Sequence, residues 1–232
     1  MRTLGLLGGM SWESTLPYYR VINETVRARL GGQHSAQLVL YSVDFAEVER
    51  LQREGRWDDA GALLARAGAA LERAGAEALV LCTNTMHRVA PQLERALSIP
   101  LLHIVDATAA AMRPRGFARV ALLGTRFTME QSFYVDRLRE RLGCDVLVPE
   151  EPDRSEVHRV IYDELCLGCV LEASRGIVLR AIERLLARGA QAVILGCTEL
   201  SLLVAPDEVP APAYDSTRIH AEAAASWALA AR

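Results

Sequence analysis

A cysteine and a threonine occupy matching positions in two copies of one short motif. Each copy joins a Gly-Ala turn, an apolar run and a small polar cluster, over residues 75–85 and 189–199. The two turns lie 114 residues apart, and the same offset relates Thr83 to Cys197. Two polar groups that face each other suit acid–base chemistry on the two faces of one atom. One group is a thiol and the other a hydroxyl, so the pair predicts an asymmetric reaction.

Cys197 is a candidate for the reactive group, because it ends an apolar run within Gly196-Cys197-Thr198-Glu199. The alternative is a small core residue, since free cysteines are usually buried and inert. A free thiol has a pKa of about 8.5, so a helix N-terminus or a nearby histidine would be needed to stabilise a thiolate. Glu199, two residues further on, is expected to affect the protonation of the thiol.

Two residues near Thr83 need separate interpretations. Cys82 directly precedes Thr83, but neighbouring residues of a strand point to opposite faces. The repeat therefore favours Thr83 as the partner of Cys197 and predicts that the Cys82 side chain points to the other face of the strand. His87, near the start of the next predicted helix, could orient a carboxylate or tune the site, although a single histidine is more often structural.

Short apolar runs alternate with longer amphipathic stretches, which is typical of an α/β fold with parallel sheets. The expected strands are residues 3–8, 37–43, 78–82, 99–103, 119–124, 145–148, 191–196 and 211–214. The first expected helix ends at Gly31-Gly32 and has apolar residues at helical spacing, namely Leu16, Tyr19, Ile22, Val26 and Leu30. Further helices are expected near residues 57–74, 87–97, 105–113, 128–142, 154–167, 172–188 and 216–231.

The repeat extends beyond the two polar motifs. Leu4–Gly8 resembles Val120–Gly124, at the start of each half of the chain. Asp106-Ala107-Thr108 resembles Asp215-Ser216-Thr217, and each is expected to cap a helix near the end of its half. The sequence therefore predicts two pseudo-symmetric, doubly wound α/β domains.

We expect these domains to span residues 1–113 and 114–232, although the last helix could pack back on the first domain. Ligands bind beyond the carboxyl ends of parallel strands, so the active site should lie in the interdomain cleft. Four polar clusters follow predicted strands and should meet there, namely Gly9-Met10-Ser11, Thr83-Asn84-Thr85, Gly124-Thr125-Arg126 and Cys197-Thr198-Glu199.

The bulk composition narrows the possible functions. The 232 residues are 51% hydrophobic, with a net charge of −3 and no basic block, which argues against disorder and nucleic-acid binding. No apolar run reaches the roughly 20 residues of a membrane span, and the short N-terminal run does not fit a signal peptide. We therefore expect a cytoplasmic protein without a membrane partner.

The chain contains no lysine, and all 26 basic residues are arginine. This excludes a pyridoxal phosphate Schiff base and a P-loop in their usual forms. Among the five cysteines, Cys166 and Cys169 form a C-x-x-C pair, which cannot close a tetrahedral zinc site by itself. We interpret that pair as helix packing and expect neither a cofactor nor a metal.

The motifs resemble those of the aspartate/glutamate racemase superfamily, the cofactor-independent amino-acid racemases. The resemblance covers nearly the whole chain. It rests on the glycine turn and Ser-Trp-Glu-Ser-Thr of residues 5–15, on Asn84-Thr85-Met86-His87, on Gly196-Cys197-Thr198-Glu199, and on Asp215-Ser216-Thr217. It implies two similar α/β domains, a site in the cleft between them, an amino-acid substrate and a homodimer.

In that family two cysteines flank the substrate Cα, and one removes the α-proton while the other donates a proton to the opposite face. The usual first motif is Cys-Asn-Thr, whereas here Thr83 precedes Asn84. The chain thus resembles the branch that pairs threonine with cysteine and prefers L-substrates. By this resemblance Cys197 is the base for L-aspartate or L-glutamate, and Thr83 relays a proton.

The resemblance also implies the substrate contacts. The α-carboxylate should meet Asn84, Thr85 and Thr198, beside Glu199. Further contacts are expected from Met10, Ser11, Gln52 and Thr125. Some relatives hold the side-chain carboxylate with a lysine, which this chain lacks, so Arg53 and Arg126 are candidate replacements.

Two other functions stay open on the sequence alone. One is a decarboxylase or cis–trans isomerase of the same superfamily, which acts on a dicarboxylate through one cysteine. The other is a non-enzymatic amino-acid sensor, against which the retained thiol argues. The sequence does not distinguish aspartate from glutamate.

Overall fold

The computed structural model describes residues 1–230 and divides the chain into two compact units. The first unit comprises Met1–His103 together with the chain from His220 onward, and the second comprises Ile104–Ile219. The repeat boundary proposed at residue 113 falls in the turn Arg113–Arg115, which directly follows α5 (Ile104–Met112). Each unit holds one four-stranded parallel sheet, as the alternation of apolar runs predicted.

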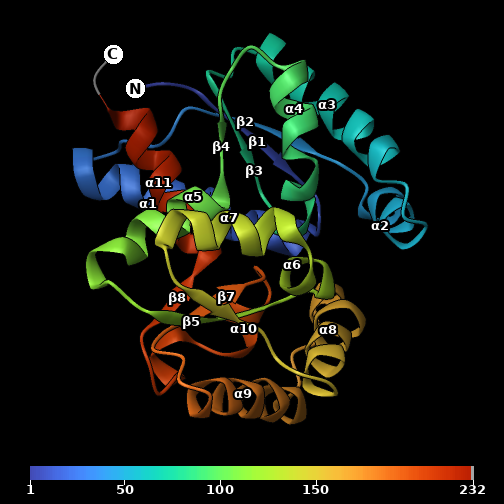
Figure 1. Cartoon of the computed structure of the whole chain (residues 1–232). Coiled ribbons are helices and arrows are strands. Elements are labelled where there is room, and N and C mark those ends of the chain that lie inside the picture. Colours follow the sequence, from blue (N-terminus) through green and yellow to red (C-terminus); the bar gives the residue numbers. More distant parts are fainter. Residues whose placement is uncertain (231–232) are drawn as a thin grey trace. The chain divides into compact units, whose positions relative to one another are not determined.

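The first sheet has the strand order β2–β1–β3–β4 (Figure 1). Its strands are β1 (Leu4–Gly8), β2 (Leu38–Ser42), β3 (Ala78–Leu81) and β4 (Leu101–Leu102). Every adjacent pair is parallel, so all four strands end at the same edge of the sheet. The sequence predicted each of these strands to within two residues at either end.

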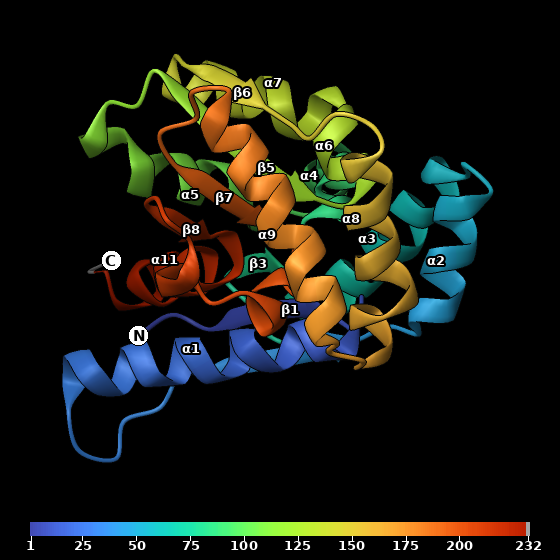
Figure 2. The same ribbon diagram turned by 90° about the horizontal axis from the view of Figure 1, so that it is seen from below.

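Helices cover both faces of the first sheet, because alternate residues of its buried strands point to opposite sides. One face packs against α2 (Phe45–Arg53), α3 (Trp57–Arg73) and α4 (Ala90–Ala96). The other face packs against α1 (Trp12–Leu30) and the C-terminal helix α11 (Ser216–Leu229), as Figure 2 shows. The alanines of α11 allow this close packing, since their short side chains meet Leu4, Leu6 and Val80.

The second sheet repeats the topology of the first, with the order β6–β5–β7–β8. Its strands are β5 (Arg119–Gly124), β6 (Asp145–Leu147), β7 (Val193–Gly196) and β8 (Ala213–Asp215). One face packs against α8 (Asp153–Asp163), α9 (Glu172–Ala187) and α10 (Leu200–Leu203), and the other against α5 and α7 (Ser132–Leu142). The identical strand orders of the two sheets support the internal repeat.

Some helices differ from the expectation. No helix was predicted over α2, although Asp44 caps its N-terminus by accepting a hydrogen bond from Ala46 N, and Val48 and Leu51 are buried at helical spacing. The helix expected over 87–97 is a 3₁₀ turn, Thr85–Val89, followed by α4, because Pro91 cannot continue a helix from the preceding turn.

Further differences lie in the second unit and at the chain end. The helix expected over 128–142 is divided at Gln131 into α6 (Arg126–Glu130) and α7. The helix expected over 154–167 ends as α8 at Asp163. The last predicted helix was extended to residue 231, which lies outside the described residues.

Asp106 does not cap a helix as expected, because α5 already begins at Ile104. Its carboxylate instead binds the guanidinium groups of Arg137 and Arg141 on α7, with nitrogen–oxygen distances between 2.7 and 3.2 Å. Asp215 does cap its helix, because its Oδ1 accepts hydrogen bonds from the N–H groups of Thr217 and Arg218. The second copy of this motif is therefore a cap and the first is an ion-pair centre.

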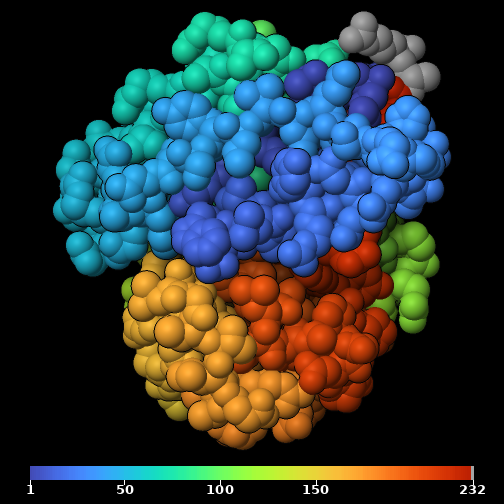
Figure 3. All heavy atoms as spheres, turned by 180° about the vertical axis from the view of Figure 1, so that it is seen from behind, coloured from blue at the N-terminus to red at the C-terminus, as the bar shows by residue number. Residues whose placement is uncertain are grey.

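The buried face of α1 is narrower than its apolar residues suggested. Tyr18, Ile22 and Val26 are fully buried, whereas Leu16 and Tyr19 are 52% and 56% exposed. Figure 3 shows α1 and the segment after it, in blue, lying open on one face of the first unit. In the part of the chain that the structure describes, no helix combines the length and apolar character needed to cross a membrane.

Candidate active site

The residues singled out from the sequence follow the two central strands of each sheet. In the first unit Met10 and Ser11 follow β1, and Thr83 begins the polar cluster after β3. In the second unit Thr125 follows β5 and Cys197 follows β7. Because β1 pairs with β3 and β5 with β7, each unit brings its two clusters together at one sheet edge.

The strand registers place Thr83 and Cys197 at equivalent positions. Leu7 of β1 is paired with Leu81 of β3, and Leu123 of β5 is paired with Leu195 of β7. Thr83 and Cys197 each come two residues after the paired leucine. The sheet register therefore agrees with the offset read from the two sequence motifs.

A glycine turn sets the position of the cluster after β1. Gly9 has a φ of +89°, and a Cβ there would collide with the Val43 carbonyl oxygen. The N–H of Gly9 donates to Thr15 Oγ1 across 2.8 Å, and Ser14 Oγ donates to the Ser11 carbonyl across 2.8 Å. The first turn of α1 thus holds Met10 and Ser11, whose side chains are buried.

Thr83 is held by the histidine that follows it. Nδ1 of His87 donates to the Thr83 carbonyl across 2.7 Å, and both residues are at most 6% exposed. Cys82 lies in the core between the sheet and α1, where burial raises the pKa of its thiol. Cys82 is therefore a core residue, and Thr83 follows it in the chain directly after the end of β3.

Other predicted contacts gather beside Thr83. Asn84 and Thr85 begin the 3₁₀ turn that carries His87, and both are buried. Gln52 comes from α2, and its Nε2 lies 2.9 Å from Met86 Sδ in the same turn. The first unit therefore brings Met10, Ser11, Gln52, Thr83, Asn84 and Thr85 to one sheet edge.

A buried histidine cluster lies behind this edge. The His87 ring is 4.5 Å from the His103 ring and 5.8 Å from the His220 ring, measured between centroids. His220 Nε2 lies 2.7 Å from the Leu102 carbonyl, which can only accept, so Nε2 carries a proton. Nδ1 then accepts from the Tyr18 hydroxyl across 2.8 Å, and burial lowers the pKa of His220 to about 4.

Cys197 and Glu199 form a hydrogen-bonded pair in the second unit. The Cys197 Sγ lies 3.1 Å from Glu199 Oε2, and the two residues are 5% and 4% exposed. Burial, and then the charge of Glu199, raise the pKa of the thiol well above its ordinary value, while the Glu199 backbone N–H acts in the opposite direction. Cys197 is therefore a neutral thiol in the free protein, hydrogen-bonded to the Glu199 side chain.

Thr125 and Thr198 lie at the same edge of the second sheet. Thr125 caps α6 by accepting from the N–H of Thr128 across 3.3 Å. Thr198 stands between Cys197 and Glu199, in the turn before α10, and is 5% exposed. These two threonines therefore accompany the thiol at the ends of β5 and β7.

Sequence reasoning missed one cysteine of this cluster. Cys166 was interpreted as helix packing, but its Sγ lies 3.7 Å from Glu199 Oε1. It belongs to η3 (Leu165–Leu167), a separate 3₁₀ turn after α8. A break near Gly168 was the available signal, whereas Cys169 is exposed and its Sγ lies 4.0 Å from the Leu167 carbonyl oxygen.

The two candidate arginines are not built into these clusters. The Arg53 side chain is 69% exposed and lies 3.7 Å from Glu49 on its own helix. Arg126 begins α6 and is exposed, although its backbone N–H donates to His158 Nδ1 across 3.3 Å. Neither position identifies the group that would hold a side-chain carboxylate.

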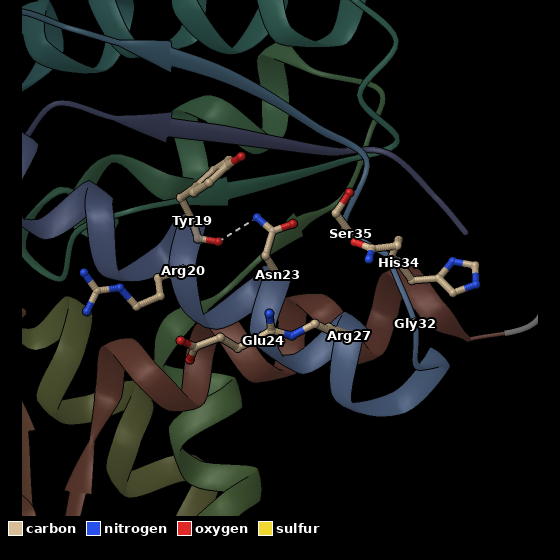
Figure 4. A pocket seen from close by; sticks show the side chains of 9 residues that line it. Tyr19, Arg20, Asn23, Glu24, Arg27, Gly32, His34 and Ser35 are labelled. Carbon is tan, nitrogen blue, oxygen red and sulfur yellow. Dashed lines mark hydrogen bonds between the residues drawn. The ribbon is translucent and has the colours of Figure 1, made fainter.

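A surface hollow in the first unit does not coincide with the predicted site. It has a volume of about 510 Å³ and is lined by α1 and the loop before β2, including Asn23, Glu24, Arg27 and His34 (Figure 4). This loop precedes β2, so the hollow lies near the edge where the parallel strands begin, opposite the polar clusters. Within residues 1–230, no group of three or more His, Cys, Asp or Glu side chains is arranged to hold a metal ion.

Comparison with known proteins found a matching family model and similar solved structures. Residues 7–224 match a family model described as Asp/Glu/Hydantoin racemase. A Yersinia pestis structure described as a candidate Asp/Glu racemase is 54% identical, with a TM-score of 0.91, and the match covers 99% of this chain and 100% of that one. A Pyrococcus horikoshii structure described as an aspartate racemase homologue is 34% identical, with a TM-score of 0.84 and coverage of 98% and 99%.

A named relative matches over a shorter segment. The broad specificity amino-acid racemase RacX of Bacillus subtilis is 24% identical over 144 residues. That match covers 56% of this chain and 58% of RacX, which is less than two-thirds of the relative's length.

Proposed function

The chain belongs to the Asp/Glu/Hydantoin racemase family, and on this premise we propose that it is a cofactor-independent racemase of L-aspartate, L-glutamate or both. The observation that carries the proposal is the buried pair of Cys197 and Glu199 at the end of β7. A thiol with an adjacent proton acceptor is suited to removing a proton from carbon.

The first half-reaction uses the second unit. The proton of Cys197 passes to Glu199 Oε2, which already lies 3.1 Å from Sγ. The thiolate then removes the α-proton of the L-amino acid and leaves a carbanion at Cα. The positive ammonium group of the substrate favours this thiolate, because a nearby opposite charge stabilises an anion.

The second half-reaction uses the first unit. Thr83 lies at the position equivalent to Cys197, and the proposal requires the two strand-end clusters to face each other across the substrate. The Thr83 hydroxyl donates its proton to the opposite face of Cα and recovers one from water. Cys197 is then a neutral thiol again, and Glu199 returns its extra proton to solvent, so the enzyme is restored and the D-enantiomer leaves.

The proposal predicts a difference between the two directions of reaction. A threonine hydroxyl is far too weak an acid to provide a resting alkoxide, so abstraction from a D-substrate is slow. The equilibrium constant between enantiomers in water is one, so the difference concerns rates and binding.

We propose that Asn84, Thr85 and Thr198 bind the α-carboxylate of the substrate, with further contacts from Met10, Ser11, Gln52 and Thr125. We also propose that the protein is a cytoplasmic homodimer.

Isotope exchange tests the proposed function directly. The purified protein, without added cofactor, is incubated in D₂O with L-aspartate or L-glutamate, and the α-proton signal is followed by NMR. The signal should decrease with at least one substrate, and Cys197→Ser should abolish the loss. Cys169→Ser is the matched control, because that thiol is exposed and its Sγ lies beside the Leu167 carbonyl oxygen. Folded protein with a free Cys197 that exchanges neither substrate would contradict the proposal and favour the decarboxylase or isomerase alternative.

A further inference from the structure

The Cys166 thiol reaches the same carboxylate that binds Cys197. Its Sγ lies 3.7 Å from Glu199 Oε1, whereas the Cys197 Sγ lies 3.1 Å from Oε2. The two thiols come from different elements, since Cys166 is in η3 and Cys197 follows β7. One buried carboxylate is thus placed between two thiols, and the proposed reaction uses only one of them.

We infer that Cys166 is a positioning residue that acts through Glu199, an inference that rests on the proposed function. Its thiol donates to Oε1, which leaves Oε2 directed at Cys197. The same donation stabilises the carboxylate as an anion and so sets how readily Glu199 takes the proton of Cys197.

Both thiols are in the state that this role requires. Burial, followed by the charge of Glu199, raises the pKa of Cys166 as it does that of Cys197. Cys166 is therefore a neutral thiol at neutral pH, which can donate a hydrogen bond but does not compete as a second thiolate. A carboxylate is the acceptor that such a weak donor binds best, because the acceptor is charged.

The backbone near Cys166 is arranged to direct this thiol. α8 ends at Asp163, and the Glu164 carboxylate accepts hydrogen bonds from Arg159 Nη1, at 2.7 Å, and from the Ser174 hydroxyl. The Glu164 carbonyl accepts from Cys169 N across 2.9 Å, which closes the turn around Cys166. Glu164 therefore binds α8 and α9 through its carboxylate and closes the turn through its carbonyl, and these contacts hold η3 beside Glu199.

Glu199 is the group that connects the two cysteines. Among the described residues, the Tyr134 phenol also interacts with Cys197, and because burial raises its pKa this phenol stays neutral. On the side of η3, the Glu164 carboxylate is bound by Arg159 and Ser174. An effect of Cys166 on the reactivity of Cys197 should consequently depend on the Glu199 carboxylate.

A double-mutant cycle on thiol reactivity tests this dependence without relying on turnover. Cleavage after arginine leaves Cys197 as the single cysteine of residues 189–218, whereas Cys166 shares residues 160–175 with Cys169, so mass spectrometry can follow the alkylation of Cys197 by itself. The rate of Cys197 alkylation by iodoacetamide is measured for the wild type, Cys166→Ala, Glu199→Gln and the double variant. Circular dichroism establishes that each is folded.

Loss of the Cys166 donor raises the proton affinity of Glu199, which then takes the thiol proton more readily. We expect Cys166→Ala to accelerate Cys197 alkylation about threefold or more at neutral pH when Glu199 is present, and to have no effect in the Glu199→Gln background. Equal acceleration of Cys197 alkylation in the wild-type and Glu199→Gln backgrounds would show that the substitution only makes Cys197 more accessible, and would overturn the inference. An unchanged rate in both would overturn the inference as well.

Further variants keep the test decisive. Cys166→Ser retains a donor and should behave as the wild type, and Cys169→Ala is the control within the same C-x-x-C pair. If Cys166→Ala does not fold, Cys166→Val removes the donor while filling the volume. In the turnover assay, the acid limb of kcat/KM should shift to higher pH in the donor-free variants and stay in place in Cys166→Ser. Because alkylation needs no substrate, a protein without racemase activity would still answer the question about Cys166.

Discussion

Glu199 accepts a hydrogen bond from Cys197 across 3.1 Å, although the two residues are separated by a single position in the chain and both are buried. The contact has two opposing consequences. The negative carboxylate opposes ionisation of the thiol, and it is also a direct acceptor for the thiol proton. In the mechanism that we propose, the buried thiol stays protonated until substrate arrives, which limits side reactions of a free thiolate.

Replacing Glu199 should separate these two consequences. Glu199→Gln removes the charge that raises the pKa of Cys197, so alkylation of Cys197 should become faster at neutral pH. The amide cannot accept the thiol proton, so turnover should fall by about 10²-fold or more. Iodoacetamide kinetics and D₂O exchange measure the two effects on one preparation. Glu172→Gln is the control because its side chain is 85% exposed, and a variant with both rates increased would exclude Glu199 as the proton acceptor.

A second thiol at position 83 should make the reaction more symmetric. Thr83→Cys places a group that can ionise at the position equivalent to Cys197, so initial rates at saturating D-aspartate or D-glutamate should rise relative to those at saturating L-enantiomer. Thr83→Ser is the matched control, since it keeps a hydroxyl and should keep the preference for L-substrates. Chiral chromatography of early time points measures both directions. An unchanged ratio in Thr83→Cys would argue against a role of residue 83 at Cα.

His87 should matter through the main chain of Thr83. His87→Ala removes the hydrogen bond from Nδ1 to the buried Thr83 carbonyl, which should lower the free energy of unfolding by about 1–3 kcal/mol and reduce turnover. His87→Asn can still donate from its side-chain amide, so it should retain most of the stability and most of the turnover. Urea unfolding and exchange assays provide the measurements. If alanine and asparagine prove equally damaging, the imidazole itself has a role beyond this hydrogen bond.

The turn after β1 should tolerate no side chain at its glycine. Gly9→Ala combines a positive φ with a collision against the Val43 carbonyl oxygen. Gly143→Ala has a similar positive φ of 67° but no atom within 4 Å of the new Cβ, so it should cost only about 1–2 kcal/mol. We expect Gly9→Ala to cost more and also to reduce substrate binding, because Met10 and Ser11 follow directly. Similar melting temperatures for the two variants would contradict this reading of the turn.

The buried imidazole of His220 should make stability depend on pH. The unfolded chain takes up a proton near the ordinary histidine pKa of about 6.5, whereas the folded ring stays neutral down to about pH 4. The unfolded state therefore binds more protons in this interval, and the free energy of unfolding should fall by about 3 kcal/mol as the pH decreases from 6.5 to 4. His220→Gln should flatten this part of the profile, and His34→Gln, at an exposed position, should leave it unchanged. Urea titrations across the interval measure the slopes, and identical slopes for the wild type and His220→Gln would refute the assignment.

Much of the fold followed from local sequence patterns. Each of the eight strands was predicted, because a buried parallel strand is a short apolar run between turn residues, as in Val193–Gly196. The helix α2 was missed although Asp44 marks its start, since only Val48 and Leu51 repeat at helical spacing before the chain turns. The prediction of which α1 residues face the core was also wrong in part, because Leu16 and Tyr19 are apolar yet exposed.

For the site, the sequence by itself determined which residues follow the central strands. It also determined that Thr83, a threonine, is the counterpart of Cys197 in the internal repeat. These features depend on chain order and on an internal repeat, both of which can be read without coordinates. Only the tertiary structure decided that Cys166 reaches Glu199 and that the rings of His87, His103 and His220 gather behind Thr83. The physical reason is that such contacts join elements far apart in the chain, and their geometry is set by how the helices pack on each sheet.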